Sequence, residues 1–449
     1  MTLPLRVLSD HAYGPEPLNT CYWAETVPDW QLDCPPLQGE TRAEVAVIGG
    51  GYTGLNAALN LAHAGVDVLL LESQFPGWGA SGRNGGFCCL GGANLDNDAL
   101  ERAVGEQGRR EWRQVERLAV AHVADLLTAE GIKADTHSDG ETILAHSPRA
   151  MRGLESELAS IRTDYGVDAQ LHDRADLERL GMAGPYHGGL SIPIGFALNP
   201  RKYVLGLLRA AQGAGARIHG FSPVQRIGRE KALFRLETAQ GQVLAHKVIF
   251  ATNGYGSEDL PPWMAGRFMP VQSSVLVTRP LSPDEIGQSG WTSSQMAYNT
   301  RNLLYYFRLM PCGRMMFGRR GGVLSSPQSD ARTMADTRQH FERHFPSLAH
   351  VETPYGWHGF LSVNRSEIPF VGPVPDMPGA FAGFSYHGNG VAMGSYAGAI
   401  LADLARDNTP TRTYPAVMQQ SPRRYPLGRH RRMLLPLGYL AMSIKDNLG

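Results

Sequence analysis

The feature that most constrains the fold is a glycine-rich turn between two runs of apolar residues. A run of four apolar residues precedes Gly49, Gly51 and Gly54, which have the spacing G-x-G-x-x-G. The first glycine of this pattern makes a tight turn, the second lets a pyrophosphate approach the backbone, and the third lets a helix pack on a strand. Glu72 ends the second apolar run, residues 66–71, where a carboxylate accepts hydrogen bonds from ribose hydroxyls. The sequence therefore predicts a strand–helix–strand site for an adenine dinucleotide.

Composition limits the classes of protein to consider. The 449 residues are enough for two domains, and 43% hydrophobic with 19% charged residues predict a large core. The formal net charge is zero and no basic block occurs, so we expect no nucleic-acid partner. No apolar stretch reaches the roughly 18 residues of a transmembrane helix, and the N-terminus lacks a signal pattern. Five cysteines in so long a chain predict no disulfide framework, so we expect a cytoplasmic protein.

Helical and strand patterns alternate along the chain without an internal repeat, which predicts domains that are discontinuous in sequence. We expect an α/β fold, in which a doubly wound Rossmann-like dinucleotide-binding domain is interleaved with an α+β substrate domain built on an antiparallel sheet. The expected parts are an N-terminal arm (1–42), the dinucleotide-binding domain (43–97, 199–265 and 356–415), the substrate domain (98–198 and 266–355) and a C-terminal tail (416–449). Helices are expected near 98–130, 148–165, 200–214, 331–345 and 393–406, and strands near 141–145, 248–254, 271–278, 303–309, 313–317 and 380–384.

Two further glycine-rich segments narrow the interpretation. One reads Gly77-Trp-Gly-Ala-Ser-Gly-Arg-Asn-Gly-Gly86, and the other is a Gly388-Asn-Gly390 turn before a late helix. Together with the first glycine motif and Glu72, they resemble the D-amino-acid oxidase/glycine oxidase family of FAD-dependent flavoproteins over roughly residues 44–406. The loop from Ala80 to Gly86 is similar to the gamma-glutamylputrescine oxidase-like branch. The resemblance implies bound FAD.

The resemblance also implies a role for each glycine-rich segment. The first motif holds the ADP half of FAD, and the loop at 80–86 lines the pyrophosphate and one flavin face. Val224, on a short strand, and residues 251–253, at a strand end, lie near the ADP half, while residues 388–391 wrap the flavin pyrimidine. The helix that follows aims its N-terminus at the flavin edge that becomes negative on reduction. The expected cofactor-binding residues are Gly49, Gly51, Tyr52, Thr53, Gly54, Glu72, Ser73, Ala80, Ser81, Gly82, Arg83, Asn84, Gly85, Gly86, Val224, Ala251, Thr252, Asn253, Gly388, Asn389, Gly390, Val391 and Ala392.

The chain departs from the family pattern in two ways. Some members tether flavin through a cysteine just after the segment that matches Trp357-His-Gly-Phe360. Leu361 stands there and no cysteine follows Cys312, so we expect non-covalent FAD. Some members use a lysine above the flavin to activate oxygen, and residues 269–318 contain none. An arginine, a histidine or the flavin pocket itself could replace it, or the acceptor is not oxygen.

The resemblance implies oxidation of a C–N bond in a small-molecule amine or amino acid. A hydride leaves the carbon next to nitrogen and reaches flavin N5, and the imine then hydrolyses. Oxygen is the expected acceptor, giving H2O2, and no dedicated general base is expected. One alternative is a dehydrogenase that passes electrons to a quinone or a carrier protein. The other is a flavoprotein tailoring enzyme, or a subunit of a heteromeric complex.

Four residues are candidates for contact with the substrate. Strand alternation places Tyr306 and Arg308 on one face, and such a face suits a substrate carboxylate. The alternative is a surface arginine beside a core tyrosine. His358 precedes the return to the FAD domain and His387 directly precedes the flavin loop. A structural histidine is the alternative for either one.

Two other patterns receive a plain structural interpretation. His340 and His344 are spaced as two ligands on one helix face, but the apolar residues beside them predict packing, so no metal is expected.

The tail combines five arginines between 423 and 432 with an apolar run over 433–440. Such a segment could lie on an anionic membrane. Because Pro436 and Gly438 interrupt a continuous amphipathic helix, we expect it to pack on the body of the protein instead.

Overall fold

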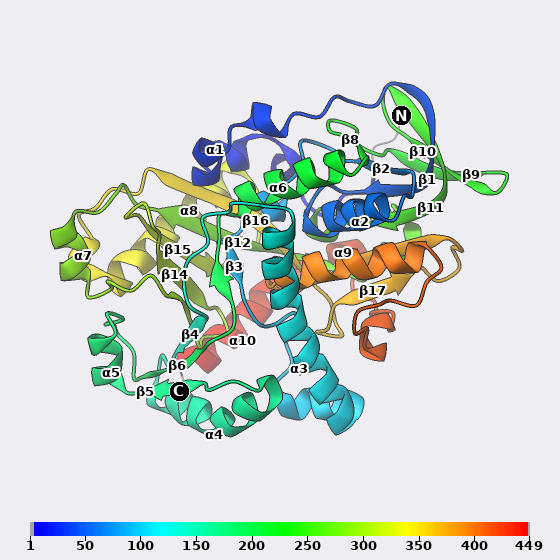
Figure 1. Ribbon diagram of the computed structural model, residues 1–449. Coiled ribbons are helices and arrows are strands. Elements are labelled where there is room, and N and C mark those ends of the chain that lie inside the picture. The colour runs from blue at the N-terminus through cyan, green and yellow to red at the C-terminus, as the bar shows by residue number, and fades with distance from the viewer. Residues whose placement is uncertain (1–3, 448–449) are drawn as a thin grey trace.

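The computed structural model describes residues 4–447, which form two large sheets (Figure 1). The first sheet has the strand order β17-β18-β11-β1-β2-β8. Along this order, neighbouring strands are parallel except for the antiparallel pair β17–β18. Two further strands of the sheet lie off this order, where β10 (Leu233–Glu237) pairs antiparallel with β11 and β9 (Arg226–Glu230) pairs antiparallel with β10. The bounds of the strands within the order are β1 (Gly39–Ile48), β2 (Val68–Leu71), β8 (Arg217–His219), β11 (Gly241–Phe250), β17 (Phe370–Pro373) and β18 (Ala380–Phe384).

Alternation along β1 sends its side chains into two different cores. Val45 and Val47 pack toward α2 (Tyr52–His63), α6 (Pro200–Gly213) and α9 (Ala392–Ala405). Ala46 and Ile48 pack in the core on the opposite face, which strands β9 (Arg226–Glu230) and β10 (Leu233–Glu237) help to cover. The predicted Rossmann-like sheet is therefore confirmed, with the three helices on one face and a hairpin on the other.

The second sheet has the order β16-β12-β15-β14-β13-β4-β6-β5 and is antiparallel except for the parallel pair β13–β4. Helix α8 (Pro327–His344) covers one face through Phe341, which packs with Phe307 and Phe317. The bounds of the strands are β4 (Glu141–Leu144), β5 (Gln170–His172), β6 (Gly189–Ile192), β12 (Met269–Val277), β13 (Met296–Asn299), β14 (Tyr305–Leu309), β15 (Met315–Arg320) and β16 (Tyr355–Val363). The antiparallel substrate sheet predicted from the sequence is thus present.

The chain changes sheet later than the expected boundary at residue 356. Strand β16 pairs with β12 along its whole length, so it belongs to the second sheet, and the chain returns to the first sheet at β17. An alternating strand pattern carries no information about which sheet will accept it. Helix α3 (Asn97–Ala129) lies almost wholly within the range expected for the substrate domain, yet it packs through Trp112 and Val115 into the core beneath the first sheet.

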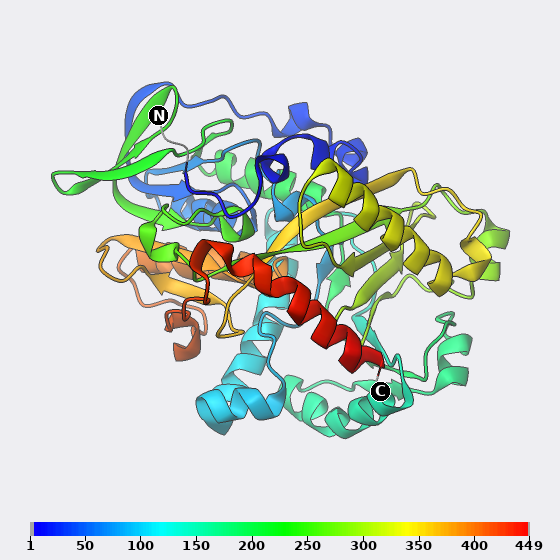
Figure 2. The same ribbon diagram turned by 180° about the vertical axis from the view of Figure 1, so that it is seen from behind.

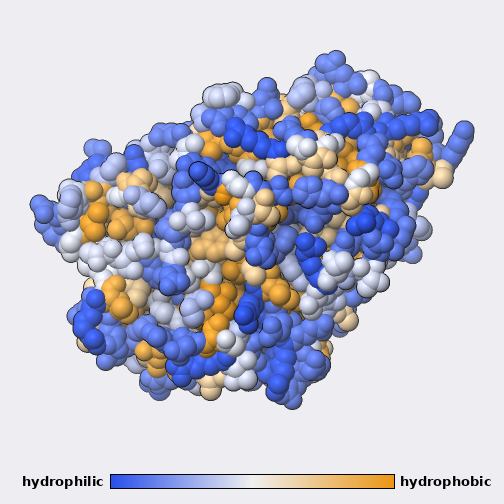
Figure 3. All heavy atoms as spheres, viewed as in Figure 1, coloured by the Kyte–Doolittle hydropathy of each residue, from blue (hydrophilic) through white to orange (hydrophobic). Residues whose placement is uncertain are grey.

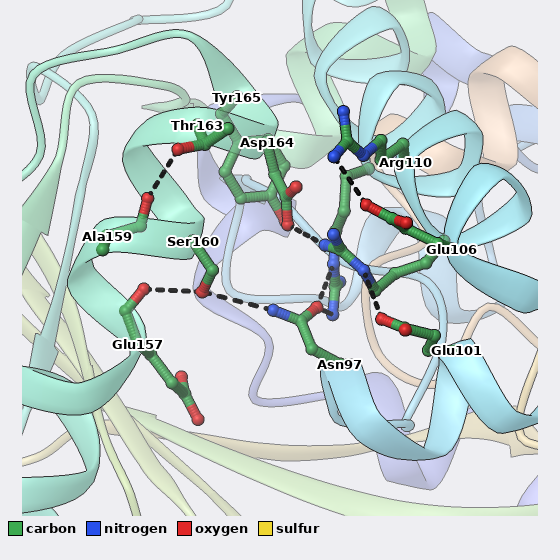
Figure 4. A network of polar contacts seen from close by, with 12 residues as sticks. Asn97, Glu101, Glu106, Arg110, Glu157, Ala159, Ser160, Thr163, Asp164 and Tyr165 are labelled. Carbon is green, nitrogen blue, oxygen red and sulfur yellow. Dashed lines mark hydrogen bonds and ion pairs between the residues drawn. The ribbon is translucent and has the colours of Figure 1, made fainter.

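A polar network joins α3 to α4 (Pro148–Tyr165) (Figure 4). Arg109 of α3 forms an ion pair with Asp164, and Asn97 Nδ2 donates to Ser160 Oγ at 3.4 Å. Tyr165 OH donates to the buried carboxylate of Glu116 at 2.6 Å. These contacts fix α4 at the lower edge of the second sheet, as both ribbon views show (Figures 1 and 2).

Short elements complete the fold. They are α1 (Tyr22–Thr26) in the N-terminal arm, α5 (Arg174–Arg179), α7 (Pro283–Ser289), and the small pair of β3 (Phe87–Cys88) with β7 (Phe196–Ala197). Trp23 of α1 packs against Trp357 on the face of the second sheet opposite α8. On the surface drawn in Figure 3, apolar residues gather through the middle of a largely hydrophilic face.

The C-terminal tail forms α10 (Leu435–Asn447), which crosses the back of the molecule (Figure 2). The prediction that Pro436 and Gly438 interrupt a helix is wrong. Pro436 lies in the first turn, where a missing N–H leaves no intrahelical bond unmade, and a single glycine costs a helix only about 1 kcal/mol. Within residues 4–447, no helix is both long and apolar enough to span a bilayer.

Candidate active site

A cavity of about 560 Å³ lies where the first glycine turn, the 78–94 loop and the second sheet meet. Of the expected cofactor-binding residues, all line it except Gly54, Gly82, Gly86 and Ala392, which lie behind its wall. Three parts of the chain that are far apart in sequence, 49–85, 224–253 and 388–391, therefore converge on one site. One detail is corrected: Val224 lines the cavity from the segment before β9, not from a strand.

The first glycine turn brings β1 and α2 into direct contact. Gly49 has φ 110°, and a Cβ on Gly54 would lie 1.8 Å from the Gly49 carbonyl oxygen. Only a residue without a side chain allows this approach, which is the packing role predicted for the third glycine. Gly51 caps α2 without a side-chain hydrogen bond, and the first turn of α2 holds no acidic residue. Ser81 Oγ accepts from Tyr52 N at 3.0 Å, and the helix dipole together with the remaining N–H groups of the first turn makes this end a suitable place for phosphate.

Glu72 lies beside this helix end and lines the cavity. Its Oε2 accepts a hydrogen bond from the Gly50 N–H at 2.6 Å, and its Oε1 accepts from Gln74 N at 2.9 Å and Ser73 Oγ at 3.0 Å. A carboxylate has about four acceptor positions, so it can accept a further hydrogen bond from a hydroxyl in the cavity. This geometry agrees with the ribose-binding role that the sequence predicts.

Arg83 is held in the wall by contacts that leave one of its nitrogens free. Its guanidinium stacks 4.1 Å from the Trp78 ring centroid, and Nε donates to the Trp78 carbonyl at 2.7 Å. The side chain is 2% exposed, yet Nη2 has no partner among the described residues. An unsatisfied buried donor on a cation is costly, so a bound anion or carbonyl would stabilise it.

The late glycine turn forms the opposite wall. His387 (φ 49°) and Gly388 (φ 112°) have left-handed backbones, and α9 begins just after them without a side-chain cap. Asn389 Nδ2 donates to the Leu90 carbonyl at 2.5 Å, which joins this turn to the 78–94 loop. The His387 Nε2 atom is buried and has no partner within residues 4–447. Burial and the nearby Arg320 charge lower the pKa of His387 to about 3, so its imidazole is neutral.

The four predicted catalytic residues separate into two pairs. Tyr306 and His387 line the cavity, and the Tyr306 hydroxyl lies 2.9 Å from Ser273 Oγ. Arg308 does not reach it, because its guanidinium donates to the Leu198 carbonyl at 2.8 Å and contacts His137. His358 is also packed away, with Nδ1 2.8 Å from Ser274 Oγ. Tyr306 thus lies on the cavity face of its strand, as alternation predicts. Arg308 lies on the same face two residues further along, where its contacts with Leu198 and His137 keep it out of the cavity.

Arg320, at the end of β15, is a cavity residue that the sequence analysis missed. It is half-buried, and its Nη2 donates to the His387 carbonyl at 2.9 Å. No carboxylate of the described chain forms an ion pair with it, and burial lowers the pKa of its guanidinium. Alternation continued to residue 320 would have placed Arg320 on the same face as Gly318, but only the structure shows that Gly318 pairs with Tyr306. The predicted strand ended at residue 317, before this position.

A buried acid that the sequence analysis also missed lies behind the cavity wall. Glu141 of β4 is 1% exposed, and its Oε1 accepts a hydrogen bond from the Tyr298 hydroxyl at 3.2 Å. Its Oε2 has no hydrogen-bond partner in the described part of the chain. Burial raises the pKa of Glu141 to about 8. Tyr298 and Cys89, both next to Glu141, line the cavity.

The histidine pair on α8 is explained by packing. His340 Nδ1 lies 2.8 Å from the Tyr305 hydroxyl, and His344 Nε2 bonds to Tyr186 within the aromatic core. Among residues 4–447, no three His, Cys, Asp or Glu side chains are grouped to hold a metal ion. In the same range, no lysine lines the cavity.

The chain is similar to known proteins over most of its length. The sequence family described as "DAO: FAD dependent oxidoreductase" matches residues 44–404. A probable oxidoreductase OrdL of Rhizobium meliloti is 31% identical over 87% of this chain and 89% of its own length. Gamma-glutamylputrescine oxidoreductase of Escherichia coli is 29% identical over 92% of this chain and 95% of its own.

Solved structures show the same fold. The glycine oxidase of Geobacillus kaustophilus superposes with a TM-score of 0.67 at 20% identity, covering 82% of this chain and 96% of its own. The iminodiacetate oxidase of Chelativorans sp. BNC1 gives a TM-score of 0.68 at 19% identity, with coverages of 82% and 96%.

The residues around the cavity fit FAD. Two helix N-termini without acidic residues in their first turns, those of α2 and α9, border it, and such ends stabilise phosphate and a flavin edge that gains negative charge. The Glu72 carboxylate is placed for ribose, and the unpartnered Arg83 Nη2 is placed for an anionic or carbonyl oxygen.

Proposed function

Because the chain belongs to the DAO family of FAD-dependent oxidoreductases, we propose that it oxidises the C–N bond of an amine substrate that carries a carboxylate, with oxygen as acceptor. Membership itself makes the chain an FAD-dependent amine or amino-acid oxidoreductase, and the resemblance inferred from its sequence is confirmed. The relatives are named for gamma-glutamylputrescine, glycine and iminodiacetate. Each of these compounds carries both an amine and a carboxylate.

The observation that carries the proposal is the Arg320 guanidinium in the cavity wall. A cation withdrawn from water without a counter-ion is unfavourable, and burial lowers the pKa of this group accordingly. A substrate carboxylate would supply the missing negative charge and accept two hydrogen bonds from the planar guanidinium. Arg320 therefore replaces Arg308 as the proposed carboxylate-binding residue.

Hydride transfer needs the substrate nitrogen as an uncharged amine, and the residues of the cavity wall favour that state. Bound FAD supplies the hydride acceptor, at its N5 atom. A positive Arg320 and the apolar parts of the wall disfavour an ammonium group, so they lower the pKa of a bound amine. Water can then take the proton, and no dedicated base is needed. Neutral His387 adds no positive charge that would repel the amine, and its Nε2 has no partner among the described residues. The balanced reaction converts substrate, O2 and water into a carbonyl compound, the released amine or ammonia, and H2O2.

The proposed attachment of FAD is non-covalent. The described cavity has one cysteine in its wall, Cys89, and burial raises the pKa of its thiol well above the ordinary value. A protonated thiol is a poor nucleophile, so it is unsuited to attack a flavin. Phe360 and Leu361 occupy the place of the tethering cysteine in some relatives and line the cavity through β16.

The test compares Arg320→Gln with Arg314→Gln on pairs of amines that differ only in a carboxylate. A substrate is first found by anaerobic bleaching of the flavin. For carboxylated substrates we expect Arg320→Gln to raise KM roughly 30-fold or more, the cost of removing one partner of a buried charge pair. Arg314 stacks on Tyr22 and Tyr355 away from the cavity, so its variant should behave as the wild type.

Two results would contradict the proposal. One is an equal effect of Arg320→Gln on amines with and without the carboxylate. The other is flavin bleaching without H2O2 release in air, which would favour the dehydrogenase alternative. The lack of a lysine in the described cavity wall is the observation that keeps this alternative open.

A further inference from the structure

Helix α10 carries an apolar stripe that faces solvent. Its exposed large side chains recur at helical spacing, which places them on one side of the helix. They are Met433 just before the helix, then Leu437, Leu440 and Ile444, which are 70%, 69%, 58% and 50% exposed. With Leu427, this short segment holds five of the eleven exposed large hydrophobic residues of the described chain. Single exposed leucines need no explanation, but a gathered set marks an interaction surface.

The stripe faces outward because the other side of the segment is firmly anchored. Leu435 is buried against Met269 and Val271 of β12. At the far end, the Asp446 carboxylate accepts hydrogen bonds from Asn302 N at 2.8 Å and Leu303 N at 3.2 Å. Just before the helix, the fully buried Arg431 forms a 2.7 Å ion pair with Glu258. The exposed stripe is thus part of a packed element.

The surroundings of the stripe are basic. Between residues 408 and 447 the one acidic residue is Asp446, and it is buried in the contact just described. The same stretch exposes four basic side chains, those of Arg423, Arg424, Arg429 and Lys445. The whole chain has a formal net charge of zero, so this positive excess is local. Apolar side chains beside Arg and Lys, on a helix that lies flat on the protein, have the chemistry of a segment bound at a lipid–water interface.

Charge also decides between a membrane and a second copy of the chain. A two-fold symmetric contact would bring the stripe against itself and place the arginines of one copy near those of the other. Such like-charge contacts oppose association. An anionic bilayer surface instead attracts the basic residues and accepts the leucines between its headgroups.

We propose that α10 and the preceding segment 423–434 form a docking surface for an anionic phospholipid bilayer, with Leu437 and Leu440 inserted at the level of the headgroups. The docked protein remains peripheral, since the contact is made by one face of one helix. Tyr439, on the same helix, lies near Arg320 of the cavity wall. Docking therefore sets the cavity close to the membrane.

The test uses the FAD-loaded full-length protein and vesicle flotation. Vesicles of phosphatidylcholine mixed with phosphatidylglycerol should bind it, binding should weaken with added salt, and pure phosphatidylcholine vesicles should bind it far less. The double variant Leu437→Gln/Leu440→Gln should bind at least about tenfold more weakly, because the inserted apolar surface is lost. Trp30→Gln is the matched control, since Trp30 is 74% exposed but lies in the N-terminal arm. Amine oxidation in solution should be the same for all three proteins.

Several outcomes would overturn the proposal. It fails if neither kind of vesicle binds, if neutral and anionic vesicles bind equally, or if Trp30→Gln and the α10 variant weaken binding alike. It also fails if light scattering shows that the α10 variant turns a dimer into a monomer while no protein binds vesicles, because the stripe is then a self-association surface. Solution turnover, which reports on the proposed oxidation, is measured separately, so failure of one proposal is distinguishable from failure of the other.

Discussion

At the scale of single residues, Glu141 is the group whose ionisation is most clearly tied to folding. It is buried behind the cavity, and no cation of the described chain forms an ion pair with it. Burial raises its pKa from 4.5 to about 8, so the folded protein holds its proton at neutral pH. The unfolded chain releases that proton near pH 4.5. The stabilisation from holding the proton is complete below that pH and is lost as the pH rises through about 8.

A Glu141→Gln variant keeps the shape of the side chain and removes the titration. Between about pH 5 and about pH 9, the free energy of unfolding of the wild type should fall relative to the variant by on the order of 3 kcal/mol. Urea unfolding of the holoenzyme at several pH values measures this difference. Glu178→Gln, at an exposed position of α5, controls for loss of a surface carboxylate. Curves for wild type and Glu141→Gln that stay parallel across the range would show that the native carboxyl ionises as in the unfolded chain.

At the scale of elements, the cofactor site depends on how closely α2 and α9 approach. A Cβ on Gly398 of α9 would lie 2.3 Å from the Thr53 carbonyl oxygen and 2.7 Å from Asn56 Cβ of α2. The first turns of these two helices lie side by side at the cavity, because a Cβ on Gly394 would lie 3.3 Å from Thr53 Oγ1. Any side chain at position 398 must therefore push apart the two helix ends that face the cofactor.

We expect Gly398→Ala to destabilise the fold by about 1–3 kcal/mol, the usual cost of overpacking, and to weaken FAD binding. Gly153→Ala is the matched control, because Gly153 lies inside α4 with nothing within 4 Å of an added Cβ. That change should instead stabilise the protein by about 0.5–1 kcal/mol through helix propensity. Denaturant unfolding and FAD titration by flavin fluorescence measure both effects. Unchanged stability and FAD affinity in Gly398→Ala would mean that the two helices separate without cost.

Local sequence patterns predicted the helices and strands well, but they predicted less well which strands pair and which side chains meet. The glycine spacing at 49–54 is a backbone requirement, so it identified the turn and the helix directly. Strand β16 alternates like any exposed-edge strand, and its membership of the second sheet depends on pairing with β12. Arg320 was missed because its role comes from β15 lying beside Tyr306, a neighbour relation that no single stretch of sequence contains. The same holds for Glu141, whose burial requires β4 to lie beside β13 and β6.

At the scale of the whole molecule, the cavity lies between the two sheets, which also share part of one core, since Leu190 and Ile192 of β6 pack in the same cluster as Val45 and Val47 of β1. Its wall combines Glu72 and Arg83, which border the first sheet, with Tyr306 and Arg320 of the second. The unpartnered nitrogens of Arg83 and His387 are buried there, so the wall is incompletely satisfied by the chain alone. We therefore expect FAD, which the proposed function places in this cavity, to stabilise the contact between the two sheets as well as to take part in the chemistry.

Removal of FAD should consequently lower the stability of the whole protein and not of the first sheet alone. Acid precipitation should release the flavin into the supernatant, as expected for non-covalent attachment. Adding FAD back to a refolded or gently stripped protein, at about a hundred times its Kd, should raise the free energy of unfolding by about 2.7 kcal/mol. Thermal scans followed by the near-ultraviolet signals of tyrosine and tryptophan report on both sheets. Trp357 lies in β16 and Trp291 packs on the second sheet, while Trp112 packs in the core with the first. Three results would contradict a cofactor bound non-covalently between the sheets. In the first, added FAD neither binds nor shifts the transition, and in the second, the flavin stays in the acid pellet. The third is a shift confined to one of two separate transitions.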